Sequence, residues 1–203
     1  AVIDECMTAF LAGHETTAVT LAWWAWCMAS NPEAQEAARR EVDAVLEGRT
    51  PLDADLPRLG YLAQTLNETM RLYPAAPILM SRRSTREIVL DGWTVPKRTM
   101  FMIPVFLLHE DERIFPEPQA FRPERFAPDA PPIPRGAFMP FGAGPRVCLG
   151  QHLAMAELTV VAAMLLQRFR LSVPEGEKTP EPVLNISLRP KDGLRLGIER
   201  RDR

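Results

Sequence analysis

The chain has 203 residues, of which 46% are hydrophobic and 25% are charged. That mixture is typical of a globular protein and supplies enough apolar surface for a core, which excludes a chain that is disordered throughout. The 24 basic and 26 acidic side chains leave a formal net charge of −2. Charge therefore gives no reason to expect binding to nucleic acid or to an anionic membrane surface.

The three cysteines do not match a disulfide framework, because their number is odd and no two of them have C-x-x-C spacing. A reducing, cytoplasmic location is the simpler interpretation. Cys6 and Cys27 lie in apolar helical sequence, where we expect both thiols to be buried. The most apolar stretch, residues 18–29, is shorter than the roughly 20 residues that span a bilayer. No transmembrane segment is predicted in this portion, and the sequence leaves open whether a membrane anchor precedes Ala1.

Apolar periodicity predicts a mainly α fold with small β-sheets. The expected helices span residues 2–30, 33–47, 61–72 and 149–168, and the expected short strands span 87–90, 99–105, 183–188 and 194–199. The first two strands lie around the turn sequence Asp91-Gly92. The first helix is apolar on nearly all sides and is therefore expected to be deeply buried. Residues 116–140 are rich in proline and are predicted to form a long irregular segment, of the kind usually tied to function.

The strongest local signal is the decamer FGAGPRVCLG at residues 141–150. One interpretation is a glycine-rich turn with an incidental thiol. A dinucleotide-binding loop fits less well, because the third glycine is absent and Pro140 stands where a strand should end. The chemistry favours a thiolate ligand. Two glycines let the backbone approach a large flat group, and Cys148 lies at the start of a predicted helix, whose N-terminus stabilises an anion.

The decamer resembles F-x-x-G-x-x-x-C-x-G, the haem loop of the cytochrome P-450 superfamily. The resemblance implies a haem b cofactor whose iron has the Cys148 thiolate as its only protein ligand, with Arg146 on a haem propionate. The other cofactor-binding positions implied by the pattern are Phe141, Gly142, Gly144 and Gly150. By position, Arg82 corresponds to a second family arginine at a propionate. A solvated arginine is the alternative there, because Arg83 and Arg86 lie nearby.

The first predicted helix contains the sequence AGHETT at residues 12–17. Taken alone, His14-Glu15 suggests the start of a zinc-protease motif, but the second histidine ligand is missing one turn later. Taken alone, Thr16 is a helix threonine that bonds the carbonyl four residues earlier. In the family this stretch crosses the face of the haem at which oxygen binds. The resemblance implies that Gly13 keeps that face open and that Thr16 and Glu15 guide protons.

Glu68 and Arg71 have E-x-x-R spacing on the third predicted helix, and residues 123–126 read PERF. Taken alone, the first motif is an exposed i,i+3 ion pair worth roughly 0.2–0.5 kcal/mol. Together the two motifs resemble the buried Glu-Arg-Arg triad of the family, which implies contacts among Glu68, Arg71 and Arg125. A carboxylate shared by two guanidinium groups can fix an irregular segment, because loss of one partner strands a buried charge. The implied role is structural, on the proximal side of the haem.

The order of these four motifs agrees with the family. The resemblance treats residues 1–203 as the C-terminal part of one haem-thiolate domain, whose N-terminal half is expected to be missing. It implies a monooxygenase that inserts one oxygen atom from dioxygen into an apolar substrate bordered by residues 77–80 and 186–188. Electrons would come from NAD(P)H through a ferredoxin or a flavoprotein reductase.

Two other functions stay open. One is a peroxide-driven peroxygenase, and the other is a non-catalytic, truncated haem-binding fragment. The first helix is apolar all round and is expected to have neighbours on every side. The chain on its own is therefore expected to aggregate, or to bind haem weakly without turnover.

Overall fold

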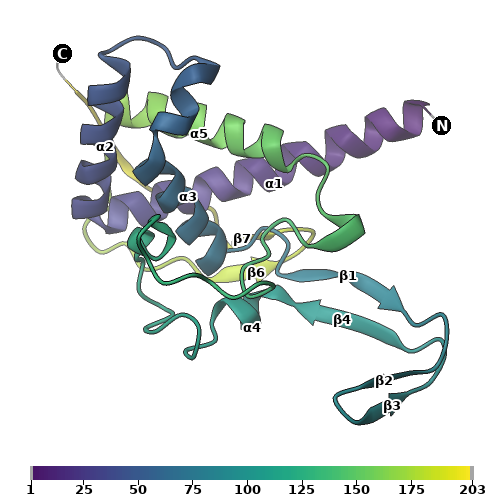
Figure 1. Cartoon of the computed structure of the whole chain (residues 1–203). Coiled ribbons are helices and arrows are strands. Elements are labelled where there is room, and N and C mark those ends of the chain that lie inside the picture. The colour runs from purple at the N-terminus through teal and green to yellow at the C-terminus, as the bar shows by residue number, and fades with distance from the viewer. Residues whose placement is uncertain (1, 202–203) are drawn as a thin grey trace.

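The computed structural model describes residues 2–201, with the side chains of residues 80 and 81 left aside. The predicted domain, residues 1–203, therefore extends beyond the described residues at both ends. The predicted substrate contact at Met80 also lies outside the described side chains. Within residues 2–201 the chain is mainly α-helical and has four two-stranded antiparallel sheets, which confirms the predicted fold class. Figure 1 shows most of the helices gathered at one end of the molecule, while two of the sheets and the N-terminal part of the first helix reach away from that end.

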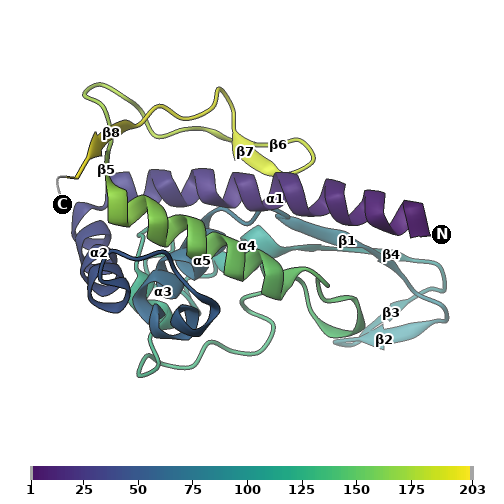
Figure 2. The ribbon, with the colours of Figure 1, turned by 90° about the horizontal axis from the view of Figure 1, so that it is seen from above.

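Four long helices build the core. They are α1 (Val2–Ser30), α2 (Pro32–Leu46), α3 (Gly60–Leu72) and α5 (Gln151–Arg168), each within two residues of its predicted boundaries. The short helices are η1 (Asp53–Arg58), α4 (Val105–His109), η2 (Pro123–Phe126) and η3 (Gly144–Arg146). In Figures 1 and 2, α2, α3 and α5 lie against the C-terminal half of α1. Their apolar side chains at helical spacing form the buried core, which includes Trp24, Leu46, Leu62, Leu66, Leu158 and Leu166. None of the helices within residues 2–201 is both long enough and apolar enough to cross a membrane.

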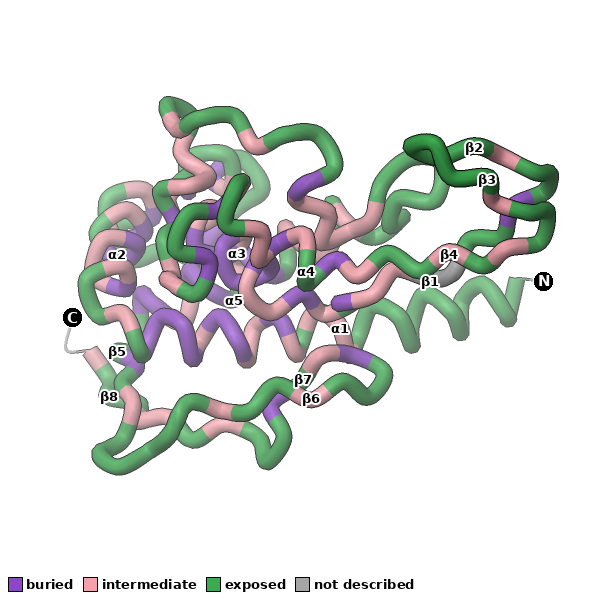
Figure 3. Tube along the Cα trace, turned by 90° about the horizontal axis from the view of Figure 1, so that it is seen from below, coloured by how far each residue is buried: buried purple, intermediate pink, exposed green. Residues whose placement is uncertain are grey.

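The two halves of α1 differ in burial, as the colours of Figure 3 show. In the second half, the indole N–H of Trp24 donates to Thr65 Oγ1 at 2.9 Å, and the ring of Trp23 stacks on Tyr73. In the first half, the large apolar side chains are each more than half exposed: Val2, Ile3, Met7, Phe10 and Leu11. The prediction of a helix buried along its whole length is therefore wrong for this half, and Cys6, predicted to be buried, is exposed. An apolar pattern shows that a helix favours burial, but it does not show what covers the helix. The neighbouring helices cover only the second half of α1.

Polar side chains join the helical elements at their ends. The Glu41 carboxylate of α2 accepts the main-chain N–H groups of Tyr61 at 2.8 Å and Leu62 at 2.9 Å. These N–H groups belong to the first turn of α3, where no helical carbonyl is available to them. The buried Gln35 side chain bonds Leu171 in both directions, with both distances at 2.9 Å. These contacts fix α3, and the strand that follows α5, relative to α2.

The observed strand pairs differ from those expected from the sequence. The pairs are β1 (Ile78–Arg83) with β4 (Met100–Pro104), β2 (Ile88–Leu90) with β3 (Trp93–Val95), β5 (Phe169–Ser172) with β8 (Gly197–Arg200), and β6 (Pro182–Leu184) with β7 (Leu188–Pro190). Asp91 and Gly92 have positive φ values of 47° and 81°, which suit a two-residue hairpin turn. They therefore join β2 directly to β3, and β4 pairs with β1, so that two of these four strands were not predicted. The strand predicted at residues 183–188 is instead the hairpin of β6 and β7.

We predict that Leu66→Ala lowers the free energy of unfolding by about 2–5 kcal/mol, because Leu66 is fully buried and its truncation leaves a cavity. The matched control is Leu11→Ala, the same change at a helical position that is 64% exposed, with an expected loss below about 1 kcal/mol. Urea unfolding followed by circular dichroism measures both changes. Equal losses in the two variants would contradict the packing described here.

Candidate functional site

Cys148 lies between η3 and α5, in the loop of residues 141–150. Its main-chain N–H donates to the carbonyl of Phe141 at 2.9 Å, and this bond closes the loop. Gly142 and Gly144 have φ values of 76° and 70°, which residues with a side chain rarely adopt. The two glycines of the motif are therefore required by the backbone of the loop that presents Cys148.

The surface around Cys148 is exposed and apolar. The thiol is exposed, Leu149 is 100% exposed and Leu153 is 66% exposed. Gly150 adds no side chain, and a Cβ built on it would lie 3.9 Å from Cys148 Sγ. A sulfur donor among apolar side chains and bare main chain fits one face of a haem, because thiolate binds haem iron and the macrocycle is large and apolar. The residues present therefore fit the cofactor that the motif implies.

The two arginines expected at the haem propionates come from different elements, and both are exposed. Arg146 ends η3, two residues before Cys148, and Arg82 lies on β1 opposite Phe101 of β4. In Figures 1 and 2, β1 and the loop that enters α5 lie on the same side of the molecule. Arg146 and Arg82 therefore belong to two separate parts of the chain whose backbones lie on that side.

Gly13, Glu15 and Thr16 lie where the exposed half of α1 meets the buried half. In the described part of the chain, nothing lies within 4 Å of a Cβ built on Gly13. The Thr16 hydroxyl donates to the carbonyl of Ala12 at 2.7 Å, the bond expected of a helical threonine. Glu15 Oε1 accepts a hydrogen bond from the Ser187 hydroxyl at 2.6 Å. This contact could not be predicted from the sequence, because a single serine between two strands forms no recognisable pattern.

Ser187 is held rigidly beside Glu15. It is 1% exposed and precedes Leu188, the first residue of β7. The N–H of Leu188 donates to the carbonyl of Ala75 at 3.0 Å, and its carbonyl accepts the indole N–H of Trp23 at 2.8 Å. The β6–β7 hairpin is thus bonded to α1 at two points, and one of them is the carboxylate of Glu15.

Glu68 is the centre of a buried ion-pair network. Arg71 binds its carboxylate with two hydrogen bonds, from Nε to Oε2 at 2.7 Å and from Nη2 to Oε1 at 2.8 Å. Arg125 Nε donates to the same Oε1 at 3.2 Å. The side chains of Glu68 and Arg71 are completely buried, and that of Arg125 is 10% exposed. The structure therefore places the three residues of the predicted triad in contact, two on α3 and one on η2.

The same three side chains also bind the main chain of the irregular segment and of the last residue of α4. Their partners, at 2.8–3.3 Å, are the N–H of Arg122 and the carbonyls of His109, Glu117 and Ala120. The guanidinium group of Arg71 also lies 5.3 Å from the centre of the Phe115 ring, which is buried. One ionic centre on α3 therefore fixes a segment that has little regular structure of its own.

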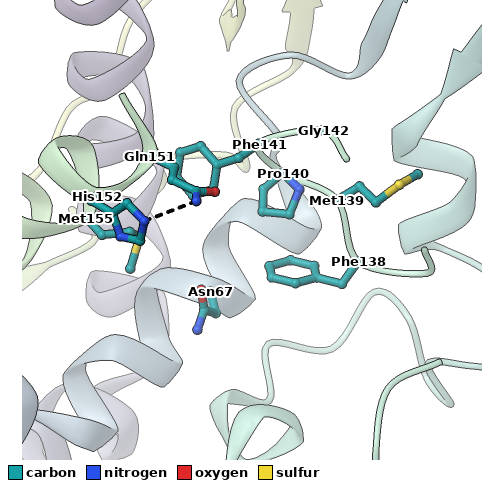
Figure 4. A pocket seen from close by; sticks show the side chains of 9 residues that line it. All are labelled: Asn67, Phe138, Met139, Pro140, Phe141, Gly142, Gln151, His152 and Met155. Carbon is teal, nitrogen blue, oxygen red and sulfur yellow. Dashed lines mark hydrogen bonds between the residues drawn. The ribbon is translucent and has the colours of Figure 1, made fainter. Parts of the chain in front are cut away.

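A hollow of about 370 Å³ lies between α3, residues 138–142 and the start of α5 (Figure 4). Its lining consists of Asn67, Phe138, Met139, Pro140, Phe141, Gly142, Gln151, His152 and Met155. Gln151 Nε2 and His152 Nε2 are 3.3 Å apart, and the two side chains point toward one another. Neither Cys148 nor any residue of α1 belongs to this lining. The lining does include Phe141 and Gly142 of the loop that presents Cys148.

Comparisons with known proteins agree over nearly the whole chain. A sequence model of the family described as Cytochrome P450 matches residues 1–196. The chain is 40% identical over 201 residues to cytochrome P450 714C3 of Oryza sativa subsp. japonica, covering 97% of this chain and 39% of that protein. It is 39% identical over 189 residues to cyclooctatin synthase of Streptomyces melanosporofaciens, covering 92% and 41%. It is 39% identical over 203 residues to leukotriene-B4 omega-hydroxylase 3 of Mus musculus, covering 96% and 38%. The chain thus spans about two fifths of the length of these curated relatives.

We predict that Glu68→Gln lowers the free energy of unfolding by about 3–5 kcal/mol, because Arg71 and Arg125 would remain buried without the carboxylate that compensates them. The control is Asp111→Asn, which removes the carboxylate of a surface pair whose Arg113 side chain is 88% exposed, at an expected cost below about 1 kcal/mol. Denaturant titration of both variants provides the measurement. A loss at Glu68 no larger than the loss at Asp111 would show that the triad does not stabilise the fold.

Proposed function

Because the chain belongs to the cytochrome P450 family, a family of haem monooxygenases, we propose that the protein binds haem through the Cys148 thiolate and inserts one oxygen atom from dioxygen into an apolar substrate. The observation that supports this most directly is the exposed thiol in a closed loop whose neighbouring groups are apolar or lack side chains. Such a thiol is poorly suited to a structural role in a core and well suited to a large planar ligand.

Groups from two parts of the chain, the loop of residues 141–150 and β1, would hold the haem. The Cys148 sulfur would bind the iron, Arg146 and Arg82 would pair with the propionates, and the main chain at Gly142 and Gly144 would approach the macrocycle. When bound, the haem supplies iron that activates dioxygen, and thiolate ligation favours cleavage of the O–O bond. The first turn of α5, whose N–H groups have no helical carbonyl partners, begins three residues after Cys148.

Glu15 and Thr16 are proposed to move protons to the oxygen-binding face. Ser187 occupies Oε1 of Glu15, so Oε2 is the oxygen left to take up and release a proton. The Thr16 hydroxyl donates its own hydrogen to Ala12, so its oxygen remains an acceptor for a second donor. In this proposal the carboxylate and the hydroxyl, on successive residues of α1, would each pass protons near the oxygen-binding face.

An apolar substrate is supported by the side chains near this relay. Phe10 and Leu11 precede Gly13 on α1, Ile186 precedes Ser187 in the hairpin, and all three of these apolar side chains are 64–82% exposed. One relative is named as an omega-hydroxylase, which agrees with the reaction class proposed here. Electrons are proposed to come from NAD(P)H through a ferredoxin or a flavoprotein reductase.

A peroxygenase is the competing function. The Glu15–Thr16 pair favours dioxygen, because the reduction of dioxygen consumes protons that this pair is placed to deliver. Product formation with NAD(P)H, a reductase and dioxygen is the expected result. Product formation with hydrogen peroxide alone would favour the peroxygenase.

Thiol labelling tests the iron ligand on the 203-residue chain. Cys6 and Cys148 are exposed and should react at once with a thiol reagent. Burial raises the pKa of Cys27 to about 12, so Cys27 should react only after unfolding. Excess haem should protect Cys148 and leave Cys6 reactive, as mass spectrometry of the labelled peptides would show. In the Cys148→Ser control, haem should protect no thiol. Continued labelling of Cys148 in the presence of bound haem would exclude it as the ligand.

Thr16→Ala should uncouple oxygen consumption from product formation in the active monooxygenase while haem binding is unchanged. We expect the yield of product per dioxygen consumed to fall to roughly a tenth or less, since proton delivery is worth orders of magnitude in rate. The matched control, Thr17→Ala, removes a hydroxyl from the next residue of α1 and should keep the yield, and Thr16→Ser should restore it. An unchanged yield in Thr16→Ala would show that Thr16 is only a helix residue.

A further inference from the structure

His109 is the last residue of α4 and is completely buried. Its ring lies between α3 and the segment that enters the haem loop. The main-chain N–H of Met139 donates to His109 Nε2 at 3.0 Å, and His109 Nδ1 lies 3.2 Å from the carbonyl oxygen of Arg71. Because an N–H group can only donate, Nε2 must have a free lone pair, and Nδ1 must have the proton that it donates to Arg71. The contacts therefore define a neutral imidazole with its hydrogen on Nδ1.

The surroundings of the ring hold it in this state. Burial, together with the positive charge of Arg71, lowers the pKa of His109 to about 4, so the ring is neutral at neutral pH. The ring centre lies 5.2 Å from that of Phe138, and Phe138 lies 4.7 Å from Phe126 of η2. Arg71 Nη1 also donates to the main-chain carbonyl of His109 at 2.9 Å. Arg71 and His109 are thus bonded to one another in both directions.

A short series of hydrogen bonds runs from His109 to Cys148. Met139, which donates to the His109 ring, accepts the N–H of Gly142 on its carbonyl at 3.0 Å. Phe141 lies between Met139 and Gly142 in the sequence, and its carbonyl accepts the N–H of Cys148 at 2.9 Å. Residues 138–142, which lead into the loop of residues 141–150, are therefore hydrogen-bonded to His109 through Met139 and to Cys148 through Phe141.

We propose that His109 is a positioning residue for the Cys148 loop, which it joins to α3 through hydrogen bonds on both ring nitrogens. The contact is independent of Arg125, so the loop and the triad are attached to Arg71 by separate bonds. An apolar side chain of similar size would fill the same volume but would leave the partly buried N–H of Met139 without this acceptor. The inference rests on the proposed function only in stating that the loop binds haem, because the hydrogen bonds of His109 form without a cofactor.

Hydrogen–deuterium exchange of the 203-residue chain without haem tests the proposal. In His109→Phe, which keeps a ring against Phe138 and loses both bonds, the amide of Met139 should exchange about tenfold faster, while the amides of α2 are unchanged. His109→Gln keeps an acceptor for Met139 and should restore slow exchange. The same change at the exposed position, His152→Phe, is the control and should leave exchange at Met139 unaltered.

A second measurement covers the case in which His109→Phe does not fold. Nitrogen chemical shifts of the wild-type imidazole should report a neutral ring with the hydrogen on Nδ1 at neutral pH, and a charged ring or the opposite tautomer would overturn the proposal. Unaltered exchange at Met139 in a folded His109→Phe would also overturn it. With haem added, the dissociation rate of haem should rise in His109→Phe and recover in His109→Gln. Faster exchange at Met139 in a chain that binds no haem would sustain the role of His109 and refute the proposed function instead.

Discussion

The Glu68 carboxylate has no contact with solvent and compensates two positive charges, those of Arg71 and Arg125. Such a group is stabilising only when every partner is in place, because the removal of one leaves a buried charge that is expensive to desolvate. The partners come from α3 and from the irregular segment, so the ionic centre forms only when that segment has its native path. Arg71 also binds the main chain of His109 at the end of α4, and the His109 ring accepts the N–H of Met139, which leads into the Cys148 loop.

The helix α1 connects this core to the opposite part of the proposed site. Its second half is fixed by Trp23 and Trp24, whose rings are wholly buried. That half supplies a rigid base for Glu15, which the structure bonds to Ser187 of the β6–β7 hairpin. The hairpin is bonded to Trp23 through Leu188, so a single helix positions both the carboxylate and the hairpin next to it. Groups far apart in the sequence are therefore held next to one another by hydrogen bonds to α1.

Much of the fold could be predicted from sequence, because helices are local structures. The helical period of apolar residues gave the four long helices to within two residues, and the spacing of Glu68 and Arg71 put both on one face of α3. Strand pairing was harder to predict from the sequence, because it depends on which two strands a short hairpin turn connects. The positive φ of Asp91 and Gly92 joins β2 to the unpredicted β3, and a period-two pattern in three residues is too short to show this.

The site shows the same limit. Cys148 and its glycines form a motif because the loop needs those residues at fixed spacing, and a motif is visible in one sequence. His109 and Ser187 make their contacts through single polar atoms to groups that lie 30 and 172 positions away, and no spacing rule connects them. The exposure of Cys6 and of the first half of α1 could not be predicted either, because an apolar pattern does not say which segments cover it.

The most direct test of the central claim, that the Cys148 sulfur binds haem iron, is the absorbance spectrum of the reduced carbonyl complex of the haem-loaded protein. The account predicts a Soret band at the position characteristic of a thiolate-ligated haem, and a shift of that band to shorter wavelength in Cys148→His. A thiolate-type spectrum that persists in Cys148→His would contradict the account and would transfer the role of ligand to Cys6 or Cys27.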